Sequence, residues 1–118
     1  MAVEIVNLEL LDWVEVTNDW PGKVAADEPD VRYKPFAIAS AAVPAGQLVQ
    51  YEPGHVEAEH SHQEGELFFV VDGSFTVGER ELTAGTLTYI PGGTRYGAVA
   101  GPSGVRFLRL HLEESTSA

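Results

Sequence analysis

The chain has 118 residues, which is enough for one domain and too few for a (β/α)₈ barrel of about 250 residues. Its net charge of −11 argues against nucleic acid and anionic lipid surfaces, which both attract basic proteins, so we expect neither a nucleic-acid nor a membrane partner. Cysteine is absent, which excludes disulfides, zinc–thiolate sites, iron–sulfur clusters and cysteine nucleophiles.

Residues 1–35 are predicted to form an N-terminal arm and loop. Within residues 1–20 two interpretations stay open, because an apolar stripe fits a helix while residues 13–17 alternate as in a strand. The stripe consists of Val3, Val6, Leu10 and Trp13. Residues 18–30 are polar and contain two prolines and a glycine, a composition typical of a loop.

No targeting or membrane segment is predicted. The N-terminus lacks a basic stretch followed by an apolar one, so we do not expect a secretory signal. No apolar run reaches the length of about 20 residues that spans a bilayer. We therefore expect a soluble, cytoplasmic protein.

Residues 36–112 are predicted to form the core of an antiparallel β-barrel. Short apolar or alternating segments follow one another here with Gly or Pro between them, a pattern typical of an all-β sandwich or barrel. These segments are FAIASAAV, QLVQY, ELFFVV, SFTV, TLTYI and residues 105–112. The Pro-Gly pair at 53–54 and the Asp-Gly pair at 72–73 are predicted to be turns that reverse adjacent strands. Residues 113–118 are small and polar, and we expect a frayed tail.

A cluster of histidines precedes one of these segments. His60 and His62 are two positions apart, so on a strand their imidazoles share one face, about 7 Å apart. Glu66 begins the next apolar segment, and a neighbouring antiparallel strand can return it to the same face. Two imidazoles and a carboxylate suit one divalent ion (Fe, Mn, Ni or Zn) with open coordination positions. The alternative is that this acidic segment is only a solvated loop.

The spacing around these residues resembles the first motif of the cupin superfamily. Gly54, His60, His62, Glu66 and Gly73 stand at every defining position of that motif. The resemblance is to small single-domain cupins. It implies one jelly-roll barrel over the whole chain, a β-sandwich that holds a divalent metal ion through the two histidines and the glutamate.

The second cupin motif is similar but incomplete. Gly85, Pro91 and Gly93 stand at its spacings, whereas Tyr96 occupies the position of its metal-binding histidine and Ala100 that of a frequent asparagine. Three roles stay open for Tyr96: a metal ligand, a hydrogen-bond partner of a bound water or substrate, or a packing residue. We favour the second, which makes Tyr96 the candidate catalytic residue.

Further residues are candidates for substrate contact. They are Tyr51, Phe68, Arg95 and His111, with Tyr89 a weaker one. Glu64 competes with Glu66 for the carboxylate role, and the spacing favours Glu66. His55 directly follows a turn glycine and is expected at the surface.

His111 is also an alternative metal ligand. It shares a strand face with Phe107 and Arg109, whereas three leucines of residues 108–112 lie on the other face. A leucine triplet is expected to point to the core, which would leave His111 outside or at a rim.

The resemblance implies a metal-dependent enzyme that acts on a small oxygen-bearing molecule, with dioxygenase-, isomerase- or cyclase-like chemistry. The alternatives are a non-catalytic cupin that binds a metal or small molecule, and a barrel whose site is vestigial. A homodimer is expected because a sandwich has exposed edge strands to cover, and we expect the first 20 residues to contribute.

Overall fold

The computed structural model describes residues 3, 5–15, 31–36 and 46–112. Its elements are η1 (Leu8–Leu10), β1 (Val14–Glu15), β2 (Val31–Phe36), β3 (Gly46–Tyr51), β4 (Val56–His60), β5 (Gly65–Val77), β6 (Arg80–Thr83), β7 (Leu87–Ile90) and β8 (Tyr96–Leu112). All strand pairs are antiparallel, which confirms the all-β prediction. The described part of the chain contains no helix long and apolar enough to cross a membrane. The predicted loop at 18–30, most of the strand FAIASAAV and the predicted tail lie outside the described residues.

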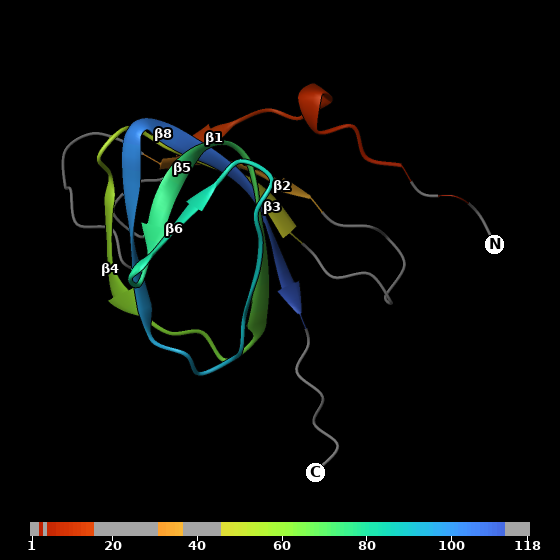
Figure 1. Ribbon diagram of the computed structural model, residues 1–118. Helices are drawn as coiled ribbons and strands as arrows, with labels where there is room; N and C mark the ends of the chain where they lie inside the picture. The colour runs from red at the N-terminus through yellow and green to blue at the C-terminus, as the bar shows by residue number, and fades with distance from the viewer. Residues whose placement is uncertain (1–2, 4, 16–30, 37–45, 113–118) are drawn as a thin grey trace, which may run out of the picture.

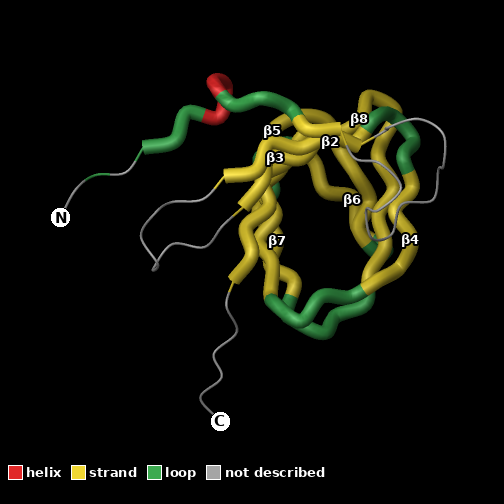
Figure 2. Tube along the Cα trace, turned by 180° about the vertical axis from the view of Figure 1, so that it is seen from behind, coloured by secondary structure: helices red, strands yellow, loops and turns green. Residues whose placement is uncertain are grey.

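The long strands β5 and β8 turn one sheet into a sandwich. Residues 65–73 of β5 pair with residues 105–112 of β8, and these halves are flanked by β7 and by β3, β2 and β1. Residues 75–77 pair with 98–100, and these halves are flanked by β6 and β4. The sheet therefore curls around a centre, as Figures 1 and 2 show from opposite sides.

The predicted reversal at Asp72-Gly73 is wrong. Strand β5 continues through this pair, and its register against β8 shifts on either side of it, as at a β-bulge. Gly73 has a φ of 77° and faces Gly104, whose φ is 76°, on the adjacent strand. Both strands bend here together, because two residues without side chains allow their backbones to approach closely.

We expect Gly73→Ala to lower the free energy of unfolding by about 2–4 kcal/mol. An added Cβ would overlap the carbonyl oxygen of Gly104, and the left-handed backbone would be strained as well. Gly78→Ala is the matched control: its φ of 60° causes similar strain, but no atom lies within 4 Å of the added Cβ. We expect it to cost about 1 kcal/mol. Urea unfolding of both variants measures the difference, and equal losses would contradict the close approach at Gly73.

The interior of the sandwich is apolar at its centre and polar toward one end. The rings of Phe75 and Phe107 stack at 4.7 Å in the buried core. Along β8 the inward face carries Phe107 and Arg109, both buried, while Leu108 and Leu110 are only half-buried on the other face. The expectation that the leucine triplet faces the core is therefore wrong. The inward face of β8 instead carries the positively charged side chain of Arg109, which lies beside the buried Glu66.

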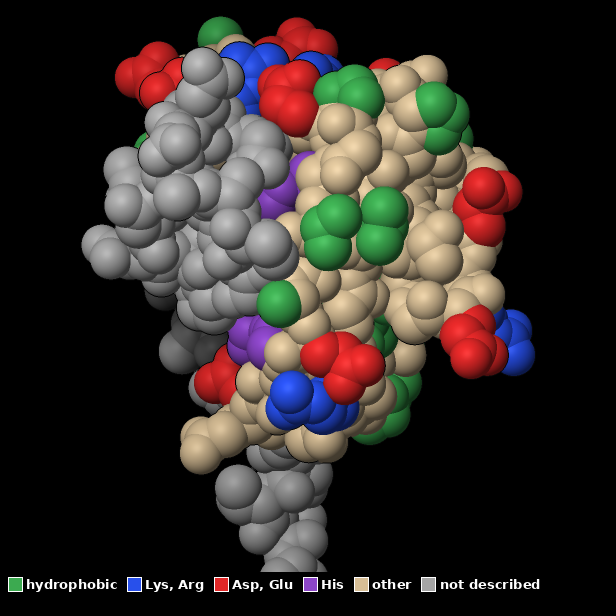
Figure 3. Space-filling model, turned by 90° about the vertical axis from the view of Figure 1, so that its left-hand side faces the viewer, with side chains coloured by type: hydrophobic (Ala, Val, Ile, Leu, Met, Phe, Trp, Pro, Cys, Tyr) green, Lys and Arg blue, Asp and Glu red, His purple; other side chains and the backbone are tan. Residues whose placement is uncertain are grey.

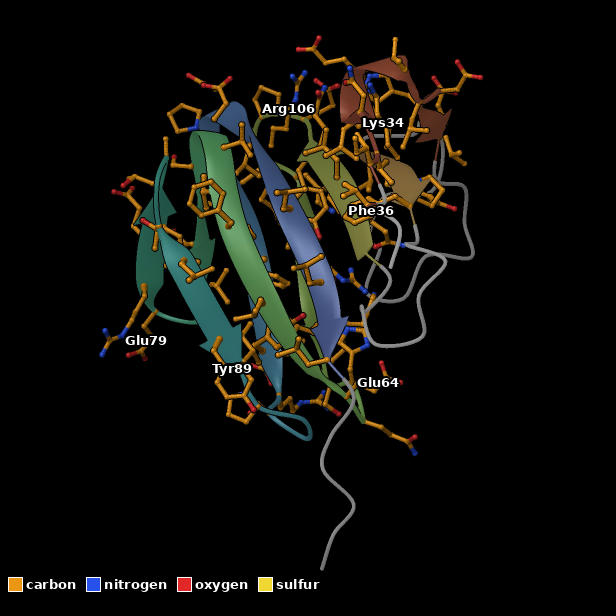
Figure 4. All side chains as sticks on the ribbon, turned by 90° about the vertical axis from the view of Figure 1, so that its right-hand side faces the viewer. Lys34, Phe36, Glu64, Glu79, Tyr89 and Arg106 are labelled. Carbon is orange, nitrogen blue, oxygen red and sulfur yellow. The ribbon has the colours of Figure 1, made fainter. Side chains whose placement is uncertain are left out.

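Residues 8–13 contact the outer face of the sheet through Leu8 and Trp13. Trp13 lies within 4.5 Å of the Arg32 guanidinium, 4.8 Å of Lys34 Nζ and 5.4 Å of the Arg106 guanidinium. Lys34 Nζ also donates to the carbonyl of Leu8 at 2.9 Å. Figure 4 shows Lys34 and Arg106 at this end of the sheet. Of residues 1–20 only 3 and 5–15 are described, and these hold one short 3₁₀ turn and a two-residue strand, so neither predicted alternative describes them fully.

Candidate functional site

The two histidines and the glutamate converge inside one end of the sandwich. His60 ends β4 and pairs across to Tyr96, the first residue of β8. His62 lies in the following loop, where its carbonyl accepts a hydrogen bond from Gly93 N at 2.7 Å. The imidazole rings of His60 and His62 are 4.7 Å apart and nearly perpendicular. Glu66, on β5, is 1% exposed, and its Oε1 lies 3.8 Å from His62 Nε2.

Both imidazoles direct a ring nitrogen into this space. His60 Nδ1 lies 2.8 Å from the carbonyl of Ala58, which can only accept, so Nδ1 carries a proton and Nε2 is the ring nitrogen that faces the other groups of the site. Burial lowers the pKa of His62, which keeps its imidazole neutral near pH 7. Both Nε2 atoms are buried: His62 Nε2 has no hydrogen-bond partner among the described residues, and His60 Nε2 faces the Glu57 carboxylate at 3.0 Å. Figure 3 shows histidine side chains reaching the surface on one side of the molecule.

Glu66 already has two partners. The Tyr96 hydroxyl donates to Oε1 at 2.6 Å, and Arg109 Nε forms an ion pair with Oε2 at 2.8 Å. Burial and this hydrogen bond raise the pKa of Tyr96 far above its usual value, so the phenol stays neutral. Tyr96 thus touches a candidate ligand, in the geometry of a residue that supports the site.

Glu57 also belongs to the site, and the sequence analysis missed it. It is 4% exposed, and its Oε1 lies 3.0 Å from His60 Nε2. Residues three apart on a regular strand face opposite ways, but β4 shifts register between Glu57 and His60, so both point inward. The Tyr51 hydroxyl donates to Glu57 Oε2, and burial raises the pKa of both groups. Nothing in the sequence distinguishes Glu57 from the exposed Glu59, because the register shift in β4 decides which of the two glutamates points inward.

Arg109 is the second residue that the sequence analysis did not assign to the site. It is buried on β8, and its charge acts on Tyr51, Glu57, His62, Tyr96 and His111. One buried cation therefore faces two buried carboxylates. The alternation of β8, with Arg109 on the same face as Phe107, is the signal that could have found it.

The remaining predicted residues divide between the inside and the outside. Tyr51 and Phe68 are buried, and the Phe68 ring lies 6.1 Å from that of Tyr96. His111 is half-buried and pairs with Glu66 across the sheet. Burial lowers its pKa. Arg95 is 67% exposed and pairs with Glu59 at 2.9 Å, so it does not join the cluster.

Three smaller expectations are also decided by exposure. Tyr89 is exposed on the outer face of the sheet and Glu64 is exposed at its end (Figure 4), so of Glu64 and Glu66 it is Glu66 that faces the histidines. His55, expected at the surface, is buried with its ring 4.6 Å from that of Tyr51. Directly after the Gly54 turn the chain folds inward, so the His55 ring packs beside Tyr51.

The cluster fits a metal ion only in part. In the described part of the chain, no three His, Asp or Glu side chains stand in the arrangement of a complete metal site, and Tyr96 and Arg109 both bind Glu66. The two buried Nε2 atoms without hydrogen bonds, however, are the donors that divalent transition metals bind. The bond from His60 Nδ1 to a carbonyl also fixes the tautomer of a metal ligand. The donor set therefore fits one divalent ion.

A cavity of about 200 Å³ lies elsewhere, beside the bend of β5 and β8. Gln50, Asp72, Gly104 and Arg106 line it, and of the site residues only Tyr51 reaches it. Its lining is polar and holds none of the candidate ligands. We therefore assign the candidate site from the buried histidine and carboxylate groups and not from this cavity.

Comparisons with known proteins agree with this architecture. The family described as the ChrR Cupin-like domain matches residues 4–113. Dimethylsulfoniopropionate lyase DddW of Ruegeria pomeroyi is 33% identical over an alignment of 85 residues, and the match covers 66% of this chain and 56% of that protein. The chain thus spans little more than half the length of this curated relative.

Two solved structures show the same fold. The polyketide cyclase RemF of Streptomyces resistomycificus has a TM-score of 0.75 at 20% identity, over 96% of this chain and 81% of that chain. An RmlC-like cupin of Shewanella frigidimarina has a TM-score of 0.69 at 17% identity, over 98% and 95%. These likenesses confirm the predicted cupin β-sandwich.

Proposed function

Because the chain belongs to the ChrR cupin-like domain family of the cupin superfamily, we propose that it is a metal-dependent enzyme acting on a small oxygen-bearing organic molecule. The observation that carries this proposal is the pair of buried imidazole Nε2 atoms that have no hydrogen-bond partner among the described residues and face two buried carboxylates. Such atoms are costly to bury without a hydrogen bond or a metal ion, and a divalent ion would satisfy both of them at once.

Each residue of the site would have a distinct role. His60, His62 and Glu66 would hold one divalent ion (Fe, Mn, Ni or Zn), which when bound would polarise a substrate oxygen. Arg109 balances the charge of Glu66, and Phe68 closes the space beneath Tyr96 with an apolar ring. The Tyr96 hydroxyl donates a hydrogen bond to Glu66 Oε1 and would exchange its proton with a substrate that enters beside the histidines.

Proton transfer is the reaction class that we favour. The pairing of a neutral phenol with a buried carboxylate supports it, because this pair can hold and move a proton without a redox change. The names of a lyase and a cyclase among the similar proteins agree with such chemistry. Dioxygenase- or isomerase-like chemistry remains the alternative within the enzyme proposal.

The reaction class is tested with protein loaded with Zn, Mn or Fe. The loaded protein is incubated in D₂O with small 2-oxo acids, 3-oxo acids and a β-sulfonio carboxylate. We expect NMR to detect solvent deuterium at the carbon next to a carbonyl or carboxylate, or elimination from that carbon. Oxygen consumption by the iron form without such exchange would instead support a dioxygenase.

Tyr96→Phe is expected to keep the bound metal and to lower turnover about 10²- to 10⁴-fold, because only the proton-carrying hydroxyl is lost. Metal content and the deuterium-exchange rate are the two measurements. Weaker metal binding in Tyr96→Phe, with stronger binding in Tyr96→His, would instead identify Tyr96 as a ligand. A Phe variant equal to the wild type in both measurements would reduce Tyr96 to a packing residue.

A non-catalytic cupin that binds a small molecule or a metal is the second candidate function. The ion pair between Arg109 and Glu66 favours it, because this pair already neutralises the carboxylate without a metal ion. Ligand-induced shifts in melting temperature without any conversion across the panel would support this alternative over the enzyme.

We also propose a homodimer in the cytoplasm. The exposed apolar side chains of Phe69, Val71, Leu87 and Tyr89 on neighbouring strands support it, since a soluble monomer rarely exposes a contiguous apolar patch. Light scattering at micromolar concentration is expected to give twice the mass of one chain, and Leu87→Glu is expected to shift it to that of one chain. A wild-type mass of a single chain would contradict the dimer.

A further inference from the structure

The proposed metal site lacks one protein ligand compared with the cupin motifs. The position of the second-motif histidine holds Tyr96, whose hydroxyl donates a hydrogen bond to Glu66 Oε1 at 2.6 Å. This hydroxyl is therefore already engaged by another residue of the proposed site. If the site has a fourth protein ligand, it must therefore come from another position in the barrel.

Glu57 is placed for this role. Its carboxylate is almost completely buried, and the register shift in β4 turns it to the same side as His60. Its Oε2 accepts the Tyr51 hydroxyl, which leaves Oε1 to face His60 Nε2 at 3.0 Å. Two ligand atoms that are each about 2.1 Å from one ion, at right angles, lie about 3.0 Å apart. The observed separation is thus that of neighbouring ligands of one ion.

The balance of charge points the same way. The interior holds the carboxylates of Glu57 and Glu66 but only one described cation in contact with them, Arg109, which forms its ion pair with Glu66. His60 Nδ1 lies at hydrogen-bond distance from the Ala58 carbonyl, so its other ring nitrogen, Nε2, is the one that faces the Glu57 carboxylate. An imidazole nitrogen and a carboxylate oxygen at this distance need a proton or a metal ion between them, and a metal ion at this place would bind both atoms.

We infer that Glu57 is the fourth protein ligand of the ion, binding through Oε1, and that Tyr51 orients it. This inference rests on the proposed metal site. The resulting set of two imidazoles and two carboxylates provides more oxygen ligands than a set of three imidazoles and one carboxylate. Carboxylate ligands shift preference toward Mn(II) and Fe(II) and away from Cu(II).

The test measures metal affinity and ligand identity in the full chain, without an activity assay. Mn(II) and Zn(II) affinities are determined by competition with a chromophoric chelator. We expect one ion per wild-type chain and at least about a 10-fold loss of affinity in Glu57→Gln. Glu59→Gln is the matched control, because Glu59 lies on the same strand but is 65% exposed and pairs with Arg95. It is expected to bind like the wild type.

A second variant separates ligation from support. Pulsed EPR of the Cu(II)-loaded protein counts bound imidazoles, and we expect two in the wild type and three in Glu57→His, with affinity restored above that of Glu57→Gln. Circular dichroism checks that each variant is folded. Two imidazoles in a folded Glu57→His variant, or an unchanged affinity in Glu57→Gln, would overturn the role of Glu57 and leave the proposed metal site standing. A wild-type chain that binds no ion would refute the metal site itself, and the fourth ligand with it.

Discussion

Arg109→Met is expected to lower the free energy of unfolding of the metal-free protein by about 3–5 kcal/mol. Arg109 and Glu66 are both buried, and their side chains meet at 2.8 Å, so the substitution leaves a carboxylate inside the barrel without its cation. The remaining hydrogen bond from Tyr96 does not supply a charge. Urea unfolding followed by tryptophan fluorescence, with a chelator present, gives the free energy.

Two further variants identify the cause of this loss. Arg106→Met changes the same residue type on the same strand, but Arg106 contacts Gln50 and Trp13 on the outer face, so we expect less than about 1 kcal/mol. Adding Glu66→Gln to Arg109→Met removes the stranded charge and is expected to recover at least about 1 kcal/mol. Equal losses of unfolding free energy in the Arg109 and Arg106 variants would show that the effect does not come from breaking the buried ion pair.

The double variant His60→Ala/His62→Ala is expected to abolish metal loading. The loss of affinity should far exceed the roughly 10- to 100-fold loss that follows mutation of a residue that only hydrogen-bonds a metal ligand. It removes both buried Nε2 donors and leaves only carboxylates. Elemental analysis after incubation with Zn(II), Mn(II) and Fe(II) measures the stoichiometry. We expect one ion per wild-type chain.

His111→Ala is the control for this double variant, because His111 pairs with Glu66 across the sheet but is not in the motif. We expect it to retain the metal. Undiminished stoichiometric metal in the double variant would refute the assignment of the two histidines. Loss of metal in His111→Ala would instead make His111 a ligand.

The sequence by itself was sufficient for the fold and for the centre of the site. Short segments with Gly or Pro between them predicted an antiparallel sandwich, because strands need residues of this kind where they end or bend. The spacing of His60, His62 and Glu66 predicted that these side chains meet, and the rings of the two histidines do lie 4.7 Å apart. Local spacing is informative here because all three residues lie between positions 60 and 66, so the chain itself keeps them near one another.

Only the tertiary structure decided which faces and which turns the chain uses. A strand period of two residues assigns Phe107 and Arg109 to one face but does not say which face is inside. Leucines were expected inside, but Phe107 and Arg109 are the buried residues, and Arg109 lies beside buried glutamates. A bulge adds one residue to a strand, so it changes the face of Glu57 relative to His60 and keeps β5 continuous at Gly73. Such shifts are set by pairing with β8, a strand distant in sequence, and so the surroundings of the two histidines depend on contacts that no local pattern encodes.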